Sequence, residues 1–250
     1  MPEKSKFHPV SIEAGLFTGN GPSPETDNRL DFIGRIGIEN PFKESNIFYG
    51  FGLSYYNGSI YQSKKEVYEM GDFDGIQAFR QLIADTIPGN YFKRRYFGID
   101  GHFSFKTILG KTSFRGDFMT GDQPGSEKTS LSVSTAVDYS LFLRKFNGGV
   151  FYLVQSIGKK NSIVLKYDFY DPNTNLSGDE IGKKAISAKT TNSTDIAYTT
   201  WGLGWNTDFN QNLRLMLYYD LVKNEISNNL AGFSKDQKDN VFTMRLQYKF

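Results

Sequence analysis

The chain has 250 residues, of which 38% are hydrophobic and 22% charged, and its formal net charge is +2. The near balance of charges excludes bulk attraction to nucleic acid or to anionic lipid, and the absence of cysteine excludes disulfides and thiolate metal sites. No run of about 18 apolar residues is present, which excludes a transmembrane helix. The 22 Phe, 15 Tyr and 25 Gly residues instead suit a β structure with aromatic faces and tight turns.

The N-terminal segment, MPEKSKFHPV, lacks the apolar core of a signal peptide. Because an exported protein needs one, we expect either that a signal has been removed or that this chain is the C-terminal part of a longer one. His8 lies in this segment and has no evident partner for chemistry.

After this segment, alternation of apolar and polar residues with a period of two predicts strands. About ten segments show it: 9–18, 29–39, 47–60, 92–105, 112–121, 148–157, 162–171, 196–206, 213–222 and 240–250. In the second segment, for example, Phe32 and Ile36 fall on one face, and Asp31 and Arg35 fall on the other. Each predicted strand therefore has one apolar face and one polar face.

The connections between these strands alternate in length along the chain. The long ones are 19–28, 61–91, 122–147, 171–195 and 223–239, and the short ones are 40–46, 106–111, 158–161 and 207–212. Short periplasmic turns opposite long external loops are typical of outer-membrane barrels. We therefore predict an all-β fold: an antiparallel transmembrane β-barrel with about ten strands, complete in itself or part of a larger barrel, with residues 1–250 as one domain.

Two of the long connections carry further signals. Residues 61–91 and 122–147 are the longest, and one of them is expected to fold into the pore. Within the first, GIQAFRQLIAD (75–85) predicts a short helix with Ile76, Phe79, Leu82 and Ile83 on one side. Within the second, LSVSTAVDYSLFL (131–143) also alternates, but a strand there would break the alternation of loop lengths, so we predict a loop.

The final segment, NVFTMRLQYKF, looks like the sorting signal that the barrel-assembly machinery reads. Its apolar residues stand at strict steps of two: Phe242, Met244, Leu246, Tyr248 and Phe250. A last strand must add to a sheet edge by main-chain pairing while its apolar face enters lipid, and this pattern meets both needs. The alternative is an ordinary C-terminal strand.

The polar faces carry charges of both signs. The pore-lining candidates are Arg35, Arg94, Arg115, Lys166, Arg214 and Arg245. In a wet lumen, opposed charge rings would tune which ions pass. The alternative is a set of cross-strand ion pairs that brace the wall, and the near balance of signs favours it for most of these residues.

No catalytic or metal site is predicted. Asp100, His102 and Ser104 share one face of a strand, but residues two apart on a strand are about 6.6 Å apart along its axis. A nucleophile and its base must meet at hydrogen-bond distance, so we predict no triad. No metal-ligand spacing, phosphate loop or nucleophile elbow is present, and no enzyme activity or cofactor is expected.

Residues 144–250 resemble the phosphate-selective porin family of outer-membrane channels, in its Bacteroidetes form. The stretches that carry the resemblance are RKFNGGVFYLVQSIGKKNSIVLKYDFYDPNTNLSGDEIG, TDIAYTTWGLGW, LMLYYDLVKNE and KDNVFTMRLQYKF. Residues 9–121 resemble the middle of the same family more loosely. The resemblance implies a wider barrel, often a homotrimer, whose N-terminal strands and signal are not in this chain. No residue here matches the family's anion-binding loop lysines.

The sequence therefore predicts a porin of the bacterial outer membrane, a passive diffusion channel for small hydrophilic solutes, with anions such as phosphate favoured. The expected partners are outer-membrane lipid, the barrel-assembly machinery and small anionic solutes, and nucleic acid is not among them. One alternative is a non-conducting outer-membrane structural or binding barrel. Another is a soluble all-β binding module.

Overall fold

The computed structural model describes residues 9–19, 29–39, 46–62, 66–82, 90–131, 136–137 and 139–250. His8, most of the predicted loop 19–28 and the turn residues 40–45 lie outside this set. Within it, the chain is all-β apart from two short 3-10 turns. No helix in the described residues is long and apolar enough to cross a membrane.

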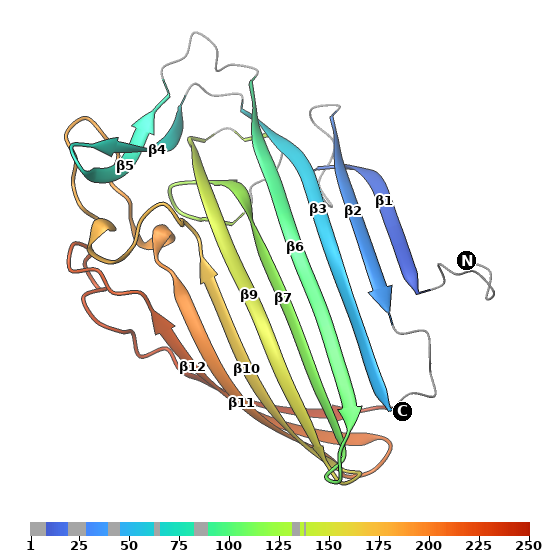
Figure 1. The fold of residues 1–250 in the computed structure, drawn as a ribbon. Helices are drawn as coiled ribbons and strands as arrows, with labels where there is room; N and C mark the ends of the chain where they lie inside the picture. The colour runs from blue at the N-terminus through green and yellow to red at the C-terminus, as the bar shows by residue number, and fades with distance from the viewer. Residues whose placement is uncertain are drawn as a thin grey trace.

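Ten strands make up one large antiparallel sheet (Figure 1). They are β1 (Val10–Thr18), β2 (Leu30–Glu39), β3 (Ile47–Gln62), β6 (Asn90–Lys106), β7 (Lys111–Gly125), β9 (Leu141–Ile157), β10 (Asn161–Asp171), β11 (Tyr198–Asp208), β12 (Leu213–Asn224) and β13 (Val241–Tyr248), each paired with the next in that order. All ten predicted strands are confirmed. Four of them, β3, β6, β7 and β9, extend further than predicted at the end where the long loops lie, which we call the external end.

The sheet is open, so the prediction of a barrel is confirmed only as far as an antiparallel sheet. The edge strands β1 and β13 end the strand path, and within the described residues they do not pair with each other. The sheet curls so that the C-terminal end lies behind its N-terminal strands (Figure 1). The curvature of these ten strands alone does not bring the two edges to the pairing distance of about 4.8 Å.

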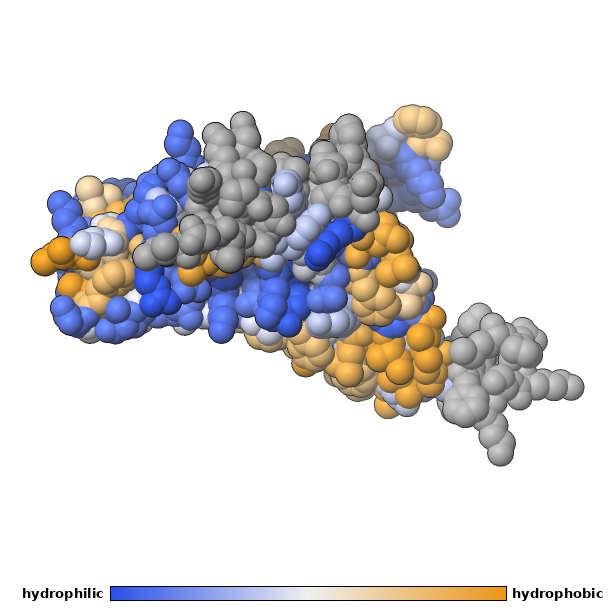
Figure 2. All heavy atoms as spheres, turned by 90° about the horizontal axis from the view of Figure 1, so that it is seen from above, coloured by the Kyte–Doolittle hydropathy of each residue, from blue (hydrophilic) through white to orange (hydrophobic). Residues whose placement is uncertain are grey.

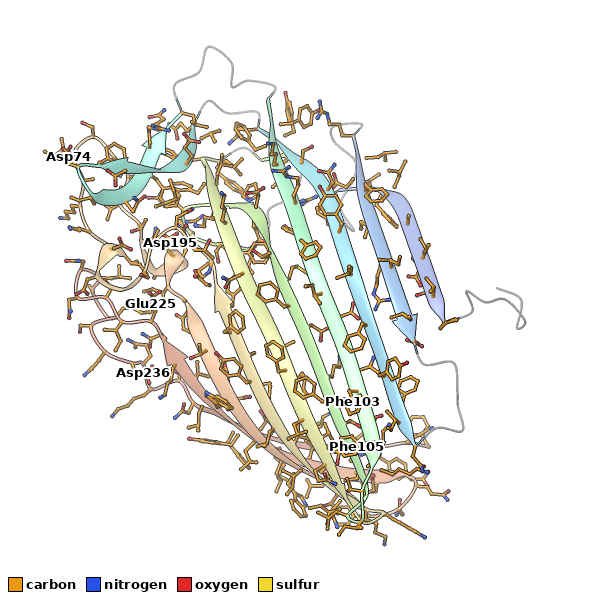
Figure 3. All side chains as sticks on the ribbon, in the orientation of Figure 1. Asp74, Phe103, Phe105, Asp195, Glu225 and Asp236 are labelled. Atoms are coloured by element: carbon orange, nitrogen blue, oxygen red, sulfur yellow. The ribbon has the colours of Figure 1, made fainter. Side chains whose placement is uncertain are left out.

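The two faces of the curved sheet differ in composition and in crowding. Side chains on the convex face diverge and stay exposed, as Phe51 and Leu53 do on β3. Figure 2 shows the molecule from above, and hydrophobic side chains gather along the face that is turned to the viewer in Figure 1. Figure 3 shows Phe103 and Phe105 near the lower end of β6. Side chains on the concave face converge. A Cβ on Gly52 would collide with the guanidinium of Arg35 and the carboxylate of Asp100, so a larger residue there would have to displace this ion pair.

Three further strands attach at the external end: β4 (Val67–Phe73), β5 (Ile76–Gln81) and β8 (Ala136–Val137). β4 and β5 form a hairpin, β4 runs parallel to the start of β9, and β8 runs parallel to the end of β3. The helix predicted over 75–85 is therefore wrong, since residues 76–81 form β5; residues 83–85 lie outside the described set. The loop predicted over 131–143 is wrong at its end, because β9 begins at Leu141.

The loops that follow β10 and β12 pack together as a cap on the external end. They contain the 3-10 turns η1 (Gly178–Glu180) and η2 (Ser193–Asp195) and a small core of Leu176, Ile181 and Ile196. The Glu225 carboxylate accepts hydrogen bonds from the Gly178 and Ala197 amides. Asp179 accepts from the backbone and side-chain amides of Asn228, and these bonds hold the pKa of Asp179 below its usual value. Figure 3 shows Glu225 and Asp195 in this cap.

Candidate functional site

The concave face carries two adjacent rows of charged side chains, which we call the charged rows. Strand register aligns Asp100, Asp117 and Asp168 in one row, with Val150 between the last two. It aligns His102, Arg115 and Lys166 in the neighbouring row, with Tyr152 between the last two. Both rows cross β6, β7, β9 and β10, because every second residue of a strand faces the same side of the sheet.

Ion pairs tie the charged rows together. Arg35 on β2 donates to both carboxylate oxygens of Asp100, with its Nη2 at 2.6 Å from Oδ2. Arg115 Nε lies 3.3 Å from Asp117 Oδ2.

Lys166 Nζ lies between two carboxylates, 2.9 Å from Asp168 and 2.8 Å from Asp220 on β12. Because each cation of the charged rows is close to a carboxylate, the net field of this surface is weak.

The six predicted pore-lining residues all lie at concave-face positions, but the structure brings only Arg35, Arg115 and Lys166 together. Arg94 is buried at the external end, where it donates to Asp31 at 2.7 Å and to the Gly19 carbonyl at 2.8 Å.

Arg214 lies at the opposite end of the sheet and pairs with Asp208 at 2.6 Å. Arg245 on β13 is exposed and lies in none of the ion pairs among the described residues. Four of the six, Arg35, Arg94, Lys166 and Arg214, therefore form ion pairs between different strands. A pore-lining role for any of the six stays a prediction.

Sequence reasoning missed two residues that position the segment after β7. Gln123 points to the concave side and donates to the Ser130 carbonyl at 2.7 Å. Arg144, at a concave position of β9, donates to the Ser126 carbonyl at 3.0 Å. The segment thus leaves β7 on the concave side and reaches the edge of β3 at β8. The alternation along β7 and β9 assigns both side chains to the polar face, and this signal could have identified them. Narrowing of a pore by this segment stays a prediction.

The structure gives Asp100, His102 and Ser104 separate partners. Asp100 binds Arg35, the His102 ring stacks on Phe48 with ring centroids 4.8 Å apart, and Ser104 is buried. They form no relay. A group of three or more potential metal ligands is also absent from the described part of the chain.

The predicted assembly-signal residues lie together on the convex face of β13. Phe242, Met244, Leu246 and Tyr248 are each more than 60% exposed, and Phe250 follows the end of the strand. Among the described residues, β13 pairs with β12 and with no other strand. In this part of the chain the last strand therefore presents an apolar face and an unpaired main-chain edge at the same time.

Deleting Phe250, or replacing it with Asp, should sharply lower the amount of protein in the outer membrane. The physical reason is that the last strand would lose its terminal apolar anchor during insertion. The measurement is membrane fractionation of cells that express the chain with an export signal, with Lys249→Gln as the control on the opposite face. Normal levels of the Phe250 variant would contradict the assembly-signal prediction.

Comparisons with protein-family models, with curated proteins and with solved structures gave no match. The resemblance to the phosphate-selective porins therefore stays a prediction.

Proposed function

We propose that this chain forms the wall of an outer-membrane porin, a passive, water-filled channel for small hydrophilic solutes that favours anions such as phosphate. The observation that carries the proposal is the contrast between the two faces of one continuous sheet. Its convex face exposes large apolar side chains from β1 to β13, while its concave face carries the charged rows. Soluble proteins rarely leave so extensive an apolar surface in water, whereas a barrel wall in a bilayer needs it.

The same proposal implies that the two open edges are covered in the membrane. A bilayer offers no hydrogen-bond partners, so an open sheet edge cannot lie in its hydrocarbon core. Further strands would have to pair with β1 and β13 to complete the wall. The resemblance to larger, trimeric porins is in line with this requirement.

Arg245 would give the channel a modest preference for anions, because the charged rows themselves are close to neutral. Asp100, Asp117 and Asp168 offset most of the field of the neighbouring cations. Arg245 adds a positive charge that no carboxylate in the described residues pairs with. Small inorganic anions should therefore pass somewhat more readily than cations.

Replacing Arg115, Lys166 and Arg245 together with Gln should shift the reversal potential toward cation selectivity while conductance is largely kept. The change removes three positive charges and leaves the row of aspartates. The measurement is the reversal potential in a salt gradient near 0.1 M, where screening over about 10 Å limits the effect to nearby charges.

The matched control removes three exposed lysines from the external loops: Lys183→Gln, Lys184→Gln and Lys235→Gln. If the variant of Arg115, Lys166 and Arg245 selects ions as the wild type does, these cations only brace the sheet.

A non-conducting barrel is the second candidate, and the cross-braced concave face favours it. Side chains that pair across this face leave less room for water, and the segment held by Gln123 lies on the same side. Planar-bilayer recording separates the two candidates. We expect stepwise conductance from purified wild-type protein, whereas insertion without conductance would overturn the channel and support the non-conducting barrel. Solubility without detergent would overturn both.

A further inference from the structure

A pocket of about 640 Å³ opens at the external end of β6, β7 and β9, beside the β4–β5 hairpin. Its lining includes Lys93 and Arg95 from β6, Asp122 and Pro124 from β7, and Lys145 from β9. On each strand these residues stand an even number of positions away from the exposed apolar residues, so they lie on the convex side. The pocket is therefore separate from the charged rows of the concave face.

The exposed apolar residues of the convex face, such as Phe97 and Ile99 on β6, form what we call the apolar belt, and the pocket lies just above it. Register aligns Arg95, Asp122 and Lys145 in one row, and Phe97, an exposed aromatic of the belt, stands two residues below Arg95 on the same face. Two residues of strand correspond to about 7 Å. In an inserted sheet, this row would stand at the level of the lipid headgroups.

The carboxylates at the pocket are already paired, and two of its cations are not. Asp122 accepts from Arg95 at 3.1 Å, and Glu69 pairs with Arg80 within the hairpin. Lys93 and Lys145 are exposed and take part in none of the ion pairs of the described chain. Arg95 Nε also lacks an acceptor within the described residues. The pocket thus has an excess of positive charge and an unused donor.

The two lysines can approach a common ligand. They stand on β6 and β9, which flank β7, so two strand spacings of about 4.8 Å separate them laterally. Pro124, on the intervening strand β7, lines the same pocket. We propose that this pocket binds a phosphate group through Lys93, Lys145 and Arg95. Both lipid headgroups and free phosphate carry this chemistry. The proposal rests on the proposed function, since only an inserted sheet brings this face to the headgroups.

The test compares the wild-type chain with the double variant Lys93→Gln/Lys145→Gln in zwitterionic detergent micelles. The matched control, Lys159→Gln/Lys160→Gln, removes two exposed lysines at the opposite end of the sheet. Isothermal titration calorimetry with dihexanoyl phosphatidic acid forms one arm, and inorganic phosphate forms the other. We expect the double variant to bind about tenfold more weakly because it loses two charge-assisted contacts, and the control to match the wild type. Lys93→Arg/Lys145→Arg should retain binding.

Equal affinity of the double variant and the wild type, or no saturable binding to the wild type, would overturn the site. Tighter binding of the lipid than of inorganic phosphate would assign the site to headgroups, and similar affinities would assign it to free phosphate. Insertion of the wild type into phosphatidylcholine vesicles is measured separately. If the protein inserts and conducts but does not bind in the titration, only the phosphate site is contradicted. If it binds phosphate through these lysines but never inserts, only the proposed porin function is contradicted.

Discussion

A Met244→Arg variant is expected to be less stable in a bilayer than the wild type by about 2–4 kcal/mol, the cost of a cation near the middle of a barrel's lipid-facing wall. Met244 is 65% exposed on the convex face of β13, where it is in register with Leu217 of β12. If this face meets lipid, the guanidinium has no water and no carboxylate beside it. The measurement is the urea midpoint of the protein refolded into vesicles, read from heat-modifiable gel mobility.

The neighbouring residue supplies the matched control. Thr243 stands one position away at the same depth, but it is in register with Tyr218 on the concave face. Thr243→Arg should therefore change stability little, because its side chain points toward the polar side. Similar losses for the two variants would show that the convex face does not meet lipid. Loss only in Thr243→Arg would mean that the two faces are assigned in reverse.

The strands of the main sheet could be predicted because alternation is a local property of the sequence. Their external ends could not, and the reason lies in the residues themselves. Asp122 on β7 and Lys145 on β9 occupy convex positions that are apolar lower on the same strands. If the exposed apolar residues lower on these strands face lipid, the strand ends beyond them need no apolar face, and the alternation can fade although the hydrogen-bonded ladder continues.

The β4–β5 hairpin shows tertiary structure overriding a local pattern. Ile76, Phe79 and Leu82 have the spacing of a helix face, yet Phe79 packs edge-on against Phe142 with ring centroids 4.9 Å apart. A turn signal was present in the sequence, the dipeptide Asp74-Gly75. Both residues have positive φ, 53° and 79°, as a two-residue hairpin turn requires. The neighbouring main chain of β9, which pairs with β4, could not be foreseen from this segment alone.

The faces of the candidate site could be predicted, but its pairing could not. Alternation assigns Arg35, Asp100, Arg115 and Lys166 to the polar side. Which of them meet depends on register between strands that are far apart in the sequence, such as β2 and β6. Register places Arg35 within reach of Asp100, 65 residues away. The sequence could therefore favour ion pairs on this face, but it could not indicate which cation meets which carboxylate.

Buried charge concentrates at one point of the external cap. The side chains of Arg144 and Asp195 are both fully buried, and Arg144 Nε donates to Asp195 Oδ1 at 2.8 Å. Asp195 also accepts from the Asn173 side chain at 2.9 Å and from the Asn192 amide at 3.0 Å. Through these bonds one carboxylate joins β9 to both ends of the loop that follows β10. Removing the cation would leave that carboxylate buried without its ion-pair partner.

Arg144→Met is therefore expected to destabilise the cap by about 3–5 kcal/mol, the range found when one partner of a buried ion pair is removed. Limited proteolysis of residues 172–197 and the thermal midpoint measure the effect. Arg80→Met is the matched control, since its pair with Glu69 is largely exposed and should contribute less than about 1 kcal/mol. The double variant Arg144→Met/Asp195→Leu should recover part of the loss, because no unpaired charge remains buried. Equal, small effects in Arg144→Met and Arg80→Met would show that the buried pair does not hold the cap, and the loop would then depend on its apolar core of Leu176, Ile181 and Ile196.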